Sequence, residues 1–129
     1  MCIRDSFKSI NDSYGHGVGD LAIKHVVELA KAHCRKDDIL ARIGGEEFLL
    51  VAFDLPMSLT LDVAERIRKS LVDTPLIIDE CKTITVTASF GVTEQSGYAT
   101  SIDDTIRLAD EALYEAKGSG RNNVKFKAA

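Results

Sequence analysis

The sequence predicts an α+β fold in which helices pack on one mixed sheet. Apolar residues recur at helical spacing over 20–34, 60–72 and 101–118. Apolar or alternating runs at 39–43, 46–53, 83–92 and 123–126 are typical of strands. The predicted element order is therefore α-β-β-α-β-α-β, within a single domain that spans residues 7–129 of the 129-residue chain.

The first predicted helix covers residues 20–34. Asp20 lies at its start, where a negative charge is favourable, and Arg35 and Lys36 follow its end, where positive charges are favourable. Its apolar positions are Ala22, Ile23, Val26, Val27, Ala30 and Cys34.

The next two elements form a predicted hairpin, ILARI (39–43) and EEFLLVAF (46–53), joined by Gly44-Gly45. Two glycines between apolar runs favour a tight primed turn, because such turns need positive φ. Glu46 and Glu47 follow the turn directly, at a sheet end where side chains can face solvent. A carboxylate beside glycines suits Mg²⁺. A polar hairpin with solvated glutamates is an equally open interpretation.

The remaining elements follow similar rules. A second helix is predicted at 60–72, and the alternation in TITVTASFGV (83–92) indicates a half-buried strand. The third helix begins at Ser101, with Asp104 three residues on as an approximate capping box. It ends at Gly118-Ser119-Gly120, and NVKF (123–126) is a short closing strand.

The first six residues, MCIRDS, match neither a signal peptide nor a helix cap. One codon series for them, ATG TGT ATA AGA GAC AGC, resembles a transposon-end adaptor used to prepare sequencing libraries. We therefore interpret residues 1–6 as a translated cloning or sequencing scar, with an ordinary N-terminus as the alternative. The domain then begins abruptly at Phe7. We expect a ferredoxin-like sheet whose first strand is largely missing.

Composition excludes several classes of function. With 45% hydrophobic and 28% charged residues, the chain is an ordinary globular one. The net charge of −4 predicts no affinity for nucleic acid polymers or anionic membranes. No apolar stretch approaches the ~20 residues of a membrane span. The cysteines, at positions 2, 34 and 81, have no metal-type spacing, and their odd number argues against a disulfide framework. We expect a cytoplasmic protein.

Four segments resemble a known family. GGEEF (44–48) resembles the signature of the GGDEF domain, the catalytic domain of diguanylate cyclases. FKSINDSYGHGVGD (7–20), TVTASFGV (85–92) and ADEALYEAKGSGRNNV (109–124) resemble its other blocks, in order. The resemblance implies a nucleotide-cyclase-like mixed sheet and a reaction that condenses two GTP into cyclic di-GMP and pyrophosphate. It also implies a catalytic homodimer, with one GTP on each subunit, and an upstream sensor domain that this chain lacks.

The resemblance further implies roles for individual residues and a Mg²⁺ or Mn²⁺ cofactor. Asn11 could otherwise be a turn residue, Asp20 a helix cap, and Lys117 with Arg121 a solvated cationic helix end. The implied roles are guanine recognition by Asn11 and Asp20, room for phosphates and ribose at Gly44 and Gly45, phosphate binding by Lys8, Lys117 and Arg121, metal binding by Glu46, and catalysis by Glu46 and Glu47.

RKDD (35–38) contains an RxxD pattern, Arg35 and Asp38, at the distance before GGEEF that the family uses for its inhibitory product site. Arginine can stack on guanine and bind phosphate in a bidentate manner. Four-residue charge patterns are frequent, so the offset from Gly44 carries the assignment.

One position departs from the family. Eight residues before Asn11, where the family has a second metal-binding aspartate, this chain has Ile3. We therefore expect the fragment to be weakly active or inactive as written. The alternative is a degenerate module that binds cyclic di-GMP through RxxD, or GTP without turnover.

Overall fold

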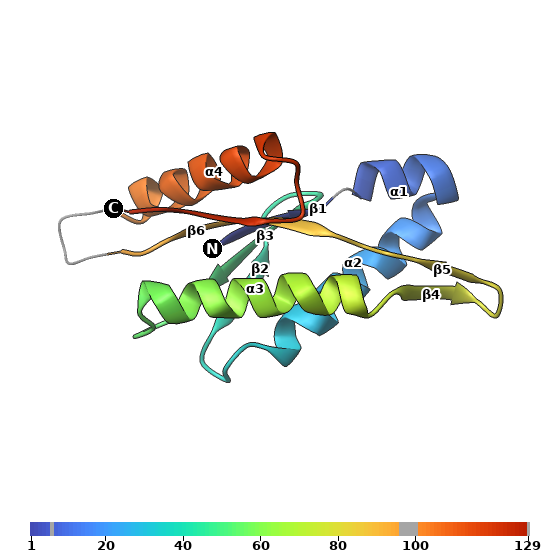
Figure 1. The fold of residues 1–129 in the computed structure, drawn as a ribbon, viewed down its shortest axis with the longest axis horizontal. Helices are drawn as coiled ribbons and strands as arrows, with labels where there is room; N and C mark the ends of the chain where they lie inside the picture. The colour runs from blue at the N-terminus through green and yellow to red at the C-terminus, as the bar shows by residue number, and fades with distance from the viewer. Residues whose placement is uncertain (6, 96–100, 129) are drawn as a thin grey trace.

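The computed structural model describes the backbone of residues 1–5, 7–95 and 101–128, and the side chains of these residues apart from 4, 5, 7 and 8. Figure 1 shows their arrangement. The elements are β1 (Cys2–Asp5), α1 (Phe7–Tyr14), α2 (His16–Ala32), β2 (Ile39–Arg42), β3 (Glu47–Val51), α3 (Met57–Asp73), β4 (Leu76–Asp79), β5 (Lys82–Ile84), β6 (Ala88–Thr93), α4 (Ile102–Gly118) and β7 (Val124–Lys127).

The main sheet has five strands in the order β2-β3-β1-β6-β7. Only β6 and β7 are parallel, and the other neighbours are antiparallel. In the central strand β1, Ile3 lies opposite Phe48 of β3 on one side and Phe90 of β6 on the other. β4 and β5 form a separate two-stranded sheet. The predicted mixed sheet with packed helices is confirmed.

Helices cover both faces of the main sheet, with α4 on one side and α3 on the other (Figure 1). Alternation along β1 shows the two layers, because successive side chains of a strand point to opposite faces. Ile3 joins the larger core cluster, together with Val26 of α2 and Ile67 of α3. Cys2 joins the smaller cluster beneath α4, together with Leu113.

The start of the chain differs from the sequence-based expectation. We expected the first strand to be largely missing, yet Cys2–Asp5 form the middle strand of the sheet. The physical reason is that Cys2 and Ile3 are apolar neighbours that can bury one side chain on each face, and they are 2% and 0% exposed. The structure does not test whether residues 1–6 are a scar.

The prediction of one half-buried strand over 83–92 was wrong. The segment is divided between two sheets, since β5 pairs with β4 while β6 pairs with β1 and β7. In β6, the residues from Ala88 to Val92 are buried on both faces, because α3 and α4 cover opposite sides of the strand. Alternation alone reports neither a change of sheet nor a second covering layer.

The three longer helices agree better with the sequence, whereas α1 and the strand β4 were not predicted. The helices predicted at 20–34 and 60–72 are observed as α2 and α3, which begin four and three residues earlier. The predicted cap of α4 is confirmed, because the Asp104 backbone N–H donates to Ser101 Oγ at 3.1 Å. No helix in the described ranges is long and apolar enough to cross a membrane.

Candidate active site

Strand register brings several chain reversals to one end of the main sheet. Residue 4 of β1 lies opposite Glu47 of β3 and Ser89 of β6, and Phe90 lies opposite Val124 of β7. The loop 43–46, the junction between β1 and α1, and the turn 118–123 therefore share this end. With neighbouring strands about 4.8 Å apart, the distance from β3 to β7 is roughly 14 Å. That span suits an extended nucleotide.

The loop between β2 and β3 is not the tight primed turn that the two glycines predicted. Neither Gly44 nor Gly45 has a positive φ. The Ile43 backbone N–H instead donates to the Glu47 carbonyl at 3.0 Å, which closes a wider loop. The Arg42 guanidinium holds this loop, with Nε 3.1 Å from the Gly44 carbonyl oxygen and a terminal nitrogen 2.9 Å from that of Gly45.

The loop combines open space at its glycines with two negatively charged side chains. Among the described residues, a Cβ added at Gly45 would meet nothing within 4 Å beyond its chain neighbours, whereas one added at Gly44 would contact Glu47 Cβ at 3.7 Å. Glu46 and Glu47 are both half-buried. Glu47 lies on the same face of β3 as Leu49, which packs beneath α4. Two carboxylates therefore stand beside exposed backbone that another molecule can approach.

The donor set at the loop fits a magnesium-type ion. Among the described side chains, no group of three or more His, Cys, Asp or Glu residues is placed to hold a metal by itself. Mg²⁺ usually binds proteins through one or two carboxylates and takes its other ligands from water and phosphate. Glu46, with Glu47 beside it, could therefore hold such an ion once a phosphate-bearing ligand shares it.

Asn11 lies against the residue before Asp20, where α1 packs on α2. A Cβ built on Gly19 would lie 1.7 Å from Asn11 Oδ1, so the Asn11 amide rests directly against the Gly19 backbone. Gly19 is buried, while Asp20, the next residue of α2, is exposed. The absence of a side chain at position 19 therefore makes room for the Asn11 amide.

The cationic residues are placed less completely. Lys117 is half-buried in the last turn of α4, and Arg121 is exposed in the turn that follows. That turn has a left-handed backbone at Gly120, Arg121 and Asn122. Lys8 belongs to α1, but its side chain lies outside the described part of the structure.

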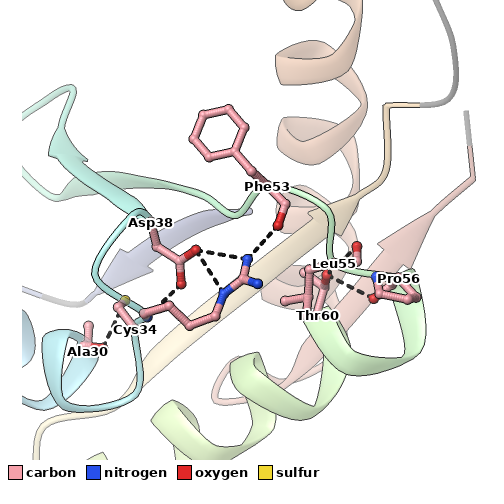
Figure 2. A network of polar contacts seen from close by, with 8 residues as sticks. Ala30, Cys34, Asp38, Phe53, Leu55, Pro56 and Thr60 are labelled. Carbon is pink, nitrogen blue, oxygen red and sulfur yellow. Dashed lines mark hydrogen bonds and ion pairs between the residues drawn. The ribbon is translucent and has the colours of Figure 1, made fainter.

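Arg35 and Asp38 form one closed turn before β2, whereas loop 43–46 follows that strand at its other end. Figure 2 shows Asp38 and its contacts in this turn. The Asp38 carboxylate accepts the Arg35 backbone N–H at 2.7 Å and its guanidinium at 3.1 Å. The same guanidinium donates to the Phe53 carbonyl at 2.5 Å. The side chain of Asp38 is 6% exposed and that of Arg35 is 52% exposed. An arginine with one free face is therefore held in place by a buried carboxylate.

The thiol of Cys2 is unreactive. Burial, followed by the nearby Asp110 carboxylate, raises the pKa of the Cys2 thiol to about 12. Because the thiolate is the reactive form, Cys2 is neutral and inert at physiological pH. Burial also raises the pKa of Cys34. Neither thiol is suited to nucleophilic chemistry.

Three residues that shape the site were not predicted from the sequence. Gly19 directly precedes Asp20, and Arg42 lies two residues before Gly44, so nearness to predicted site residues was the available signal. Asn123 was predicted only as part of a closing strand, although its side-chain amide contacts the carbonyls of Ala116, Ser119 and Arg121. No sequence pattern indicated those contacts.

Comparison with known proteins identifies the family. Residues 1–123 match the family described as "Diguanylate cyclase, GGDEF domain". The chain belongs to the GGDEF domain family. This GGDEF domain is 42% identical over 120 residues to Diguanylate cyclase A of Treponema denticola, which covers 93% of the chain and 32% of that protein. The chain thus spans about a third of the length of this relative.

Solved structures agree with the fold. The GGDEF domain is similar to the active GGEEF domain of a diguanylate cyclase from Vibrio cholerae, with a TM-score of 0.89, 29% identity, and coverage of 97% of this chain and 79% of that one. It is equally similar to the GGDEF domain of DgcB from Caulobacter crescentus in complex with c-di-GMP. That comparison has a TM-score of 0.90, 29% identity, and coverage of 97% and 74%.

Proposed function

We propose that this GGDEF domain condenses two GTP molecules into cyclic di-GMP and pyrophosphate, as the catalytic part of a longer bacterial signalling protein in the cytoplasm. The supporting observation is the register that gathers loop 43–46, the β1–α1 junction and turn 118–123 at one end of the sheet. Two copies would each present one GTP, and an upstream sensor would control their pairing. Cyclic di-GMP would be both product and inhibitor.

Each side chain has a definite task in this proposal. Asn11 and Asp20 would pair with the guanine edge, because an amide and a carboxylate match its acceptors and donors. Lys8, Lys117 and Arg121 would bind the phosphates. The open space at Gly45 would admit phosphates and ribose.

Glu46 would hold Mg²⁺ or Mn²⁺, with Glu47 as the neighbouring acid in the catalytic centre. When bound, the ion would neutralise triphosphate charge and help to activate the attacking hydroxyl. The 3′-oxygen of one GTP forms a bond to the α-phosphorus of the other. The bond from that phosphorus to the pyrophosphate oxygen breaks, and the hydroxyl proton passes to solvent. The same exchange at the other 3′-hydroxyl closes the ring and releases the second pyrophosphate.

Turnover by the 129-residue chain itself should be weak or absent. Ile3, at the position of the family's second metal-binding aspartate, is 0% exposed within the core. The second candidate function is therefore binding alone, of GTP without turnover or of cyclic di-GMP at Arg35 and Asp38. The half-exposed Arg35 guanidinium, held by Asp38, favours the latter.

Calorimetry with GTP and Mg²⁺, and separately with cyclic di-GMP, distinguishes these functions when paired with chromatography of the products. We expect GTP to bind with little product formed. Rapid conversion of GTP would refute the weak-activity proposal, and no heat with either nucleotide would refute both functions.

Gly45→Ala sharpens this experiment. Beyond its chain neighbours, its Cβ would meet no atom of the described residues within 4 Å, so stability should change by less than about 0.5 kcal/mol. GTP affinity should nevertheless fall if the ligand occupies that space.

A further inference from the structure

Three consecutive residues after α4 have a left-handed backbone. The φ angles are +100° at Gly120, 63° at Arg121 and 44° at Asn122. Glycine adopts this conformation freely, but a residue with a Cβ does so at a steric cost. Such conformations persist only where surrounding contacts determine them, and they are concentrated at ligand clamps and other functional sites.

The side-chain amide of Asn123 supplies the main contacts. Its Nδ2 donates to the carbonyl oxygens of Ala116 at 2.9 Å, Ser119 at 3.3 Å and Arg121 at 3.0 Å. Carbonyls at the end of a helix lack partners within the helix, so they are available to an outside donor. The Asn123 amide therefore connects the last turn of α4, the residue after the helix and Arg121 to one another.

The other atom of that amide fixes its orientation. Asn123 Oδ1 is buried and has no hydrogen-bond partner among the described residues. Exchanging the nitrogen and the oxygen would point an acceptor at three acceptors. The contacts of Asn123 thus depend on donation, which a carboxylate of the same shape cannot provide.

Backbone bonds anchor the turn to the helix and the sheet. The Arg121 N–H donates to the Ala116 carbonyl at 3.1 Å, and the Asn122 N–H donates to Ser89 Oγ at 3.2 Å. The Asn123 carbonyl accepts the Phe90 N–H at 2.9 Å. The backbone of Arg121 is therefore fixed on both sides, although its side chain is exposed.

We propose that Asn123 is a positioning residue that presets Arg121 for the phosphates of the bound nucleotide. The proposal rests on the GTP binding proposed above and adds the residue that prepares the phosphate clamp. A cation that leaves a fixed backbone position loses less freedom on binding, which improves affinity without a new contact to the ligand.

Asn123→Asp tests the proposal, and Asn122→Asp is its matched control. Both variants exchange one amide for one carboxylate at adjacent positions, so long-range repulsion of GTP is nearly equal. Asn122 uses its Oδ1 to accept from Arg68 at 3.4 Å, a role that a carboxylate keeps. Aspartate also tolerates the left-handed backbone at position 122.

We expect calorimetry to show that GTP affinity falls roughly tenfold in Asn123→Asp, as for loss of a well-placed hydrogen bond to a charged group. Affinity for GMP should change by less than about twofold, since the β- and γ-phosphates are absent. Asn122→Asp should bind both nucleotides nearly as the unsubstituted chain does. Equal losses for GTP and GMP, or equal losses in the two variants, would overturn the positioning role.

A double-mutant cycle with Arg121→Gln separates positioning from general stability. If Asn123 acts through Arg121, Asn123→Asp should cause no further loss of GTP affinity in the Arg121→Gln background. Additive losses would contradict the proposal. Should Asn123→Asp fail to fold, Asn123→Ser, which keeps one donor, replaces it with a smaller expected loss.

Hydrogen exchange measured without nucleotide tests the positioning role of Asn123 separately from the proposed function. Absence of GTP binding by the unsubstituted chain would overturn the proposed function, and the positioning role with it. The exchange rate of the Arg121 amide would still show whether Asn123 fixes the turn. Faster exchange in Asn123→Asp than in Asn122→Asp supports this fixing role, and equal exchange refutes it.

Discussion

The two turns at the site end of the sheet are held in different ways. Loop 43–46 has no positive φ, and its contacts include the exposed side chain of Arg42 and a backbone bond from Ile43 to Glu47. Turn 118–123 has three left-handed residues and is tied by Asn123 to α4 and by Ser89 to β6. We therefore expect the metal side of the proposed site to adjust to a ligand more readily than the phosphate side, whose backbone is fixed beforehand.

The largest expected effect comes from Gly91→Ala, which disturbs the fixed side alone. A Cβ on Gly91 would lie 2.1 Å from the Ala109 carbonyl oxygen and 2.4 Å from the Leu113 nitrogen, so α4 must move away from β6. Overpacking of this kind costs about 3 kcal/mol. Urea unfolding measures the loss of stability. Amide hydrogen exchange should accelerate more at Arg121 than in loop 43–46.

Gly17→Ala is the control for this change. Gly17 lies in α2, and outside the adjoining turns of that helix a Cβ there would meet no atom of the described chain within 4 Å. The same substitution should therefore be neutral or slightly stabilising, because alanine favours helices. Equal stability of the two variants would contradict the close packing of α4 on β6.

Sequence predicted elements well where the signal was local. The Ser101 cap, the hairpin and the three long helices follow from neighbouring residues. It failed where the answer depended on distant strands. The segment 83–92 alternates without a break, yet only pairing with β4 or β1 divides it between two sheets.

Some features of the candidate site were also predicted from the sequence, and others were not. GGEEF and the glycines were found directly, because a short motif carries them. The prediction of a primed turn was wrong, since Arg42 binds the carbonyls of Gly44 and Gly45 in a wider loop. The role of Asn123 was not predicted, because the carbonyls that its amide meets are brought together by the left-handed turn after α4.

A smaller effect is expected from Arg42→Gln, which loosens the adaptable side. Two hydrogen bonds to the carbonyls of Gly44 and Gly45 are lost, but Arg42 is exposed, so stability should fall by no more than about 1 kcal/mol. Hydrogen exchange should accelerate at the Ile43 amide, which donates to the Glu47 carbonyl across the loop, and affinity for GTP with Mg²⁺ should drop several-fold. Exchange at Arg121 should not change. Arg42→Lys, which can keep one bond, should be intermediate, and unaltered exchange at Ile43 would show that Arg42 does not hold the loop.

The smallest expected effect concerns Glu65, which orients Arg68 beneath the fixed turn. The Glu65 carboxylate accepts two bonds from Arg68, at 2.6 and 2.9 Å, and Arg68 in turn reaches Asn122. The hydrogen bonds from Arg68 hold the pKa of Glu65 below its ordinary value of 4.5. The pair therefore stabilises the fold fully above pH 4.5, and this stabilisation is lost as the pH falls through the lower, folded-state pKa.

Glu65→Gln should therefore lower the free energy of unfolding at neutral pH by about 0.5 kcal/mol, because solvent screens this partly exposed pair. The difference from the unsubstituted chain should shrink as the pH falls through the lowered pKa of folded Glu65, because below it the carboxyl is protonated in both states. Urea unfolding at neutral pH and at a series of lower pH values measures this, and hydrogen exchange at the Asn122 amide shows whether the pair supports the turn. A difference that grows in acid would contradict the lowered pKa. Unchanged exchange at Asn122, with the expected pH dependence, would mean that Asn123 and Ser89 hold the turn without help from Arg68.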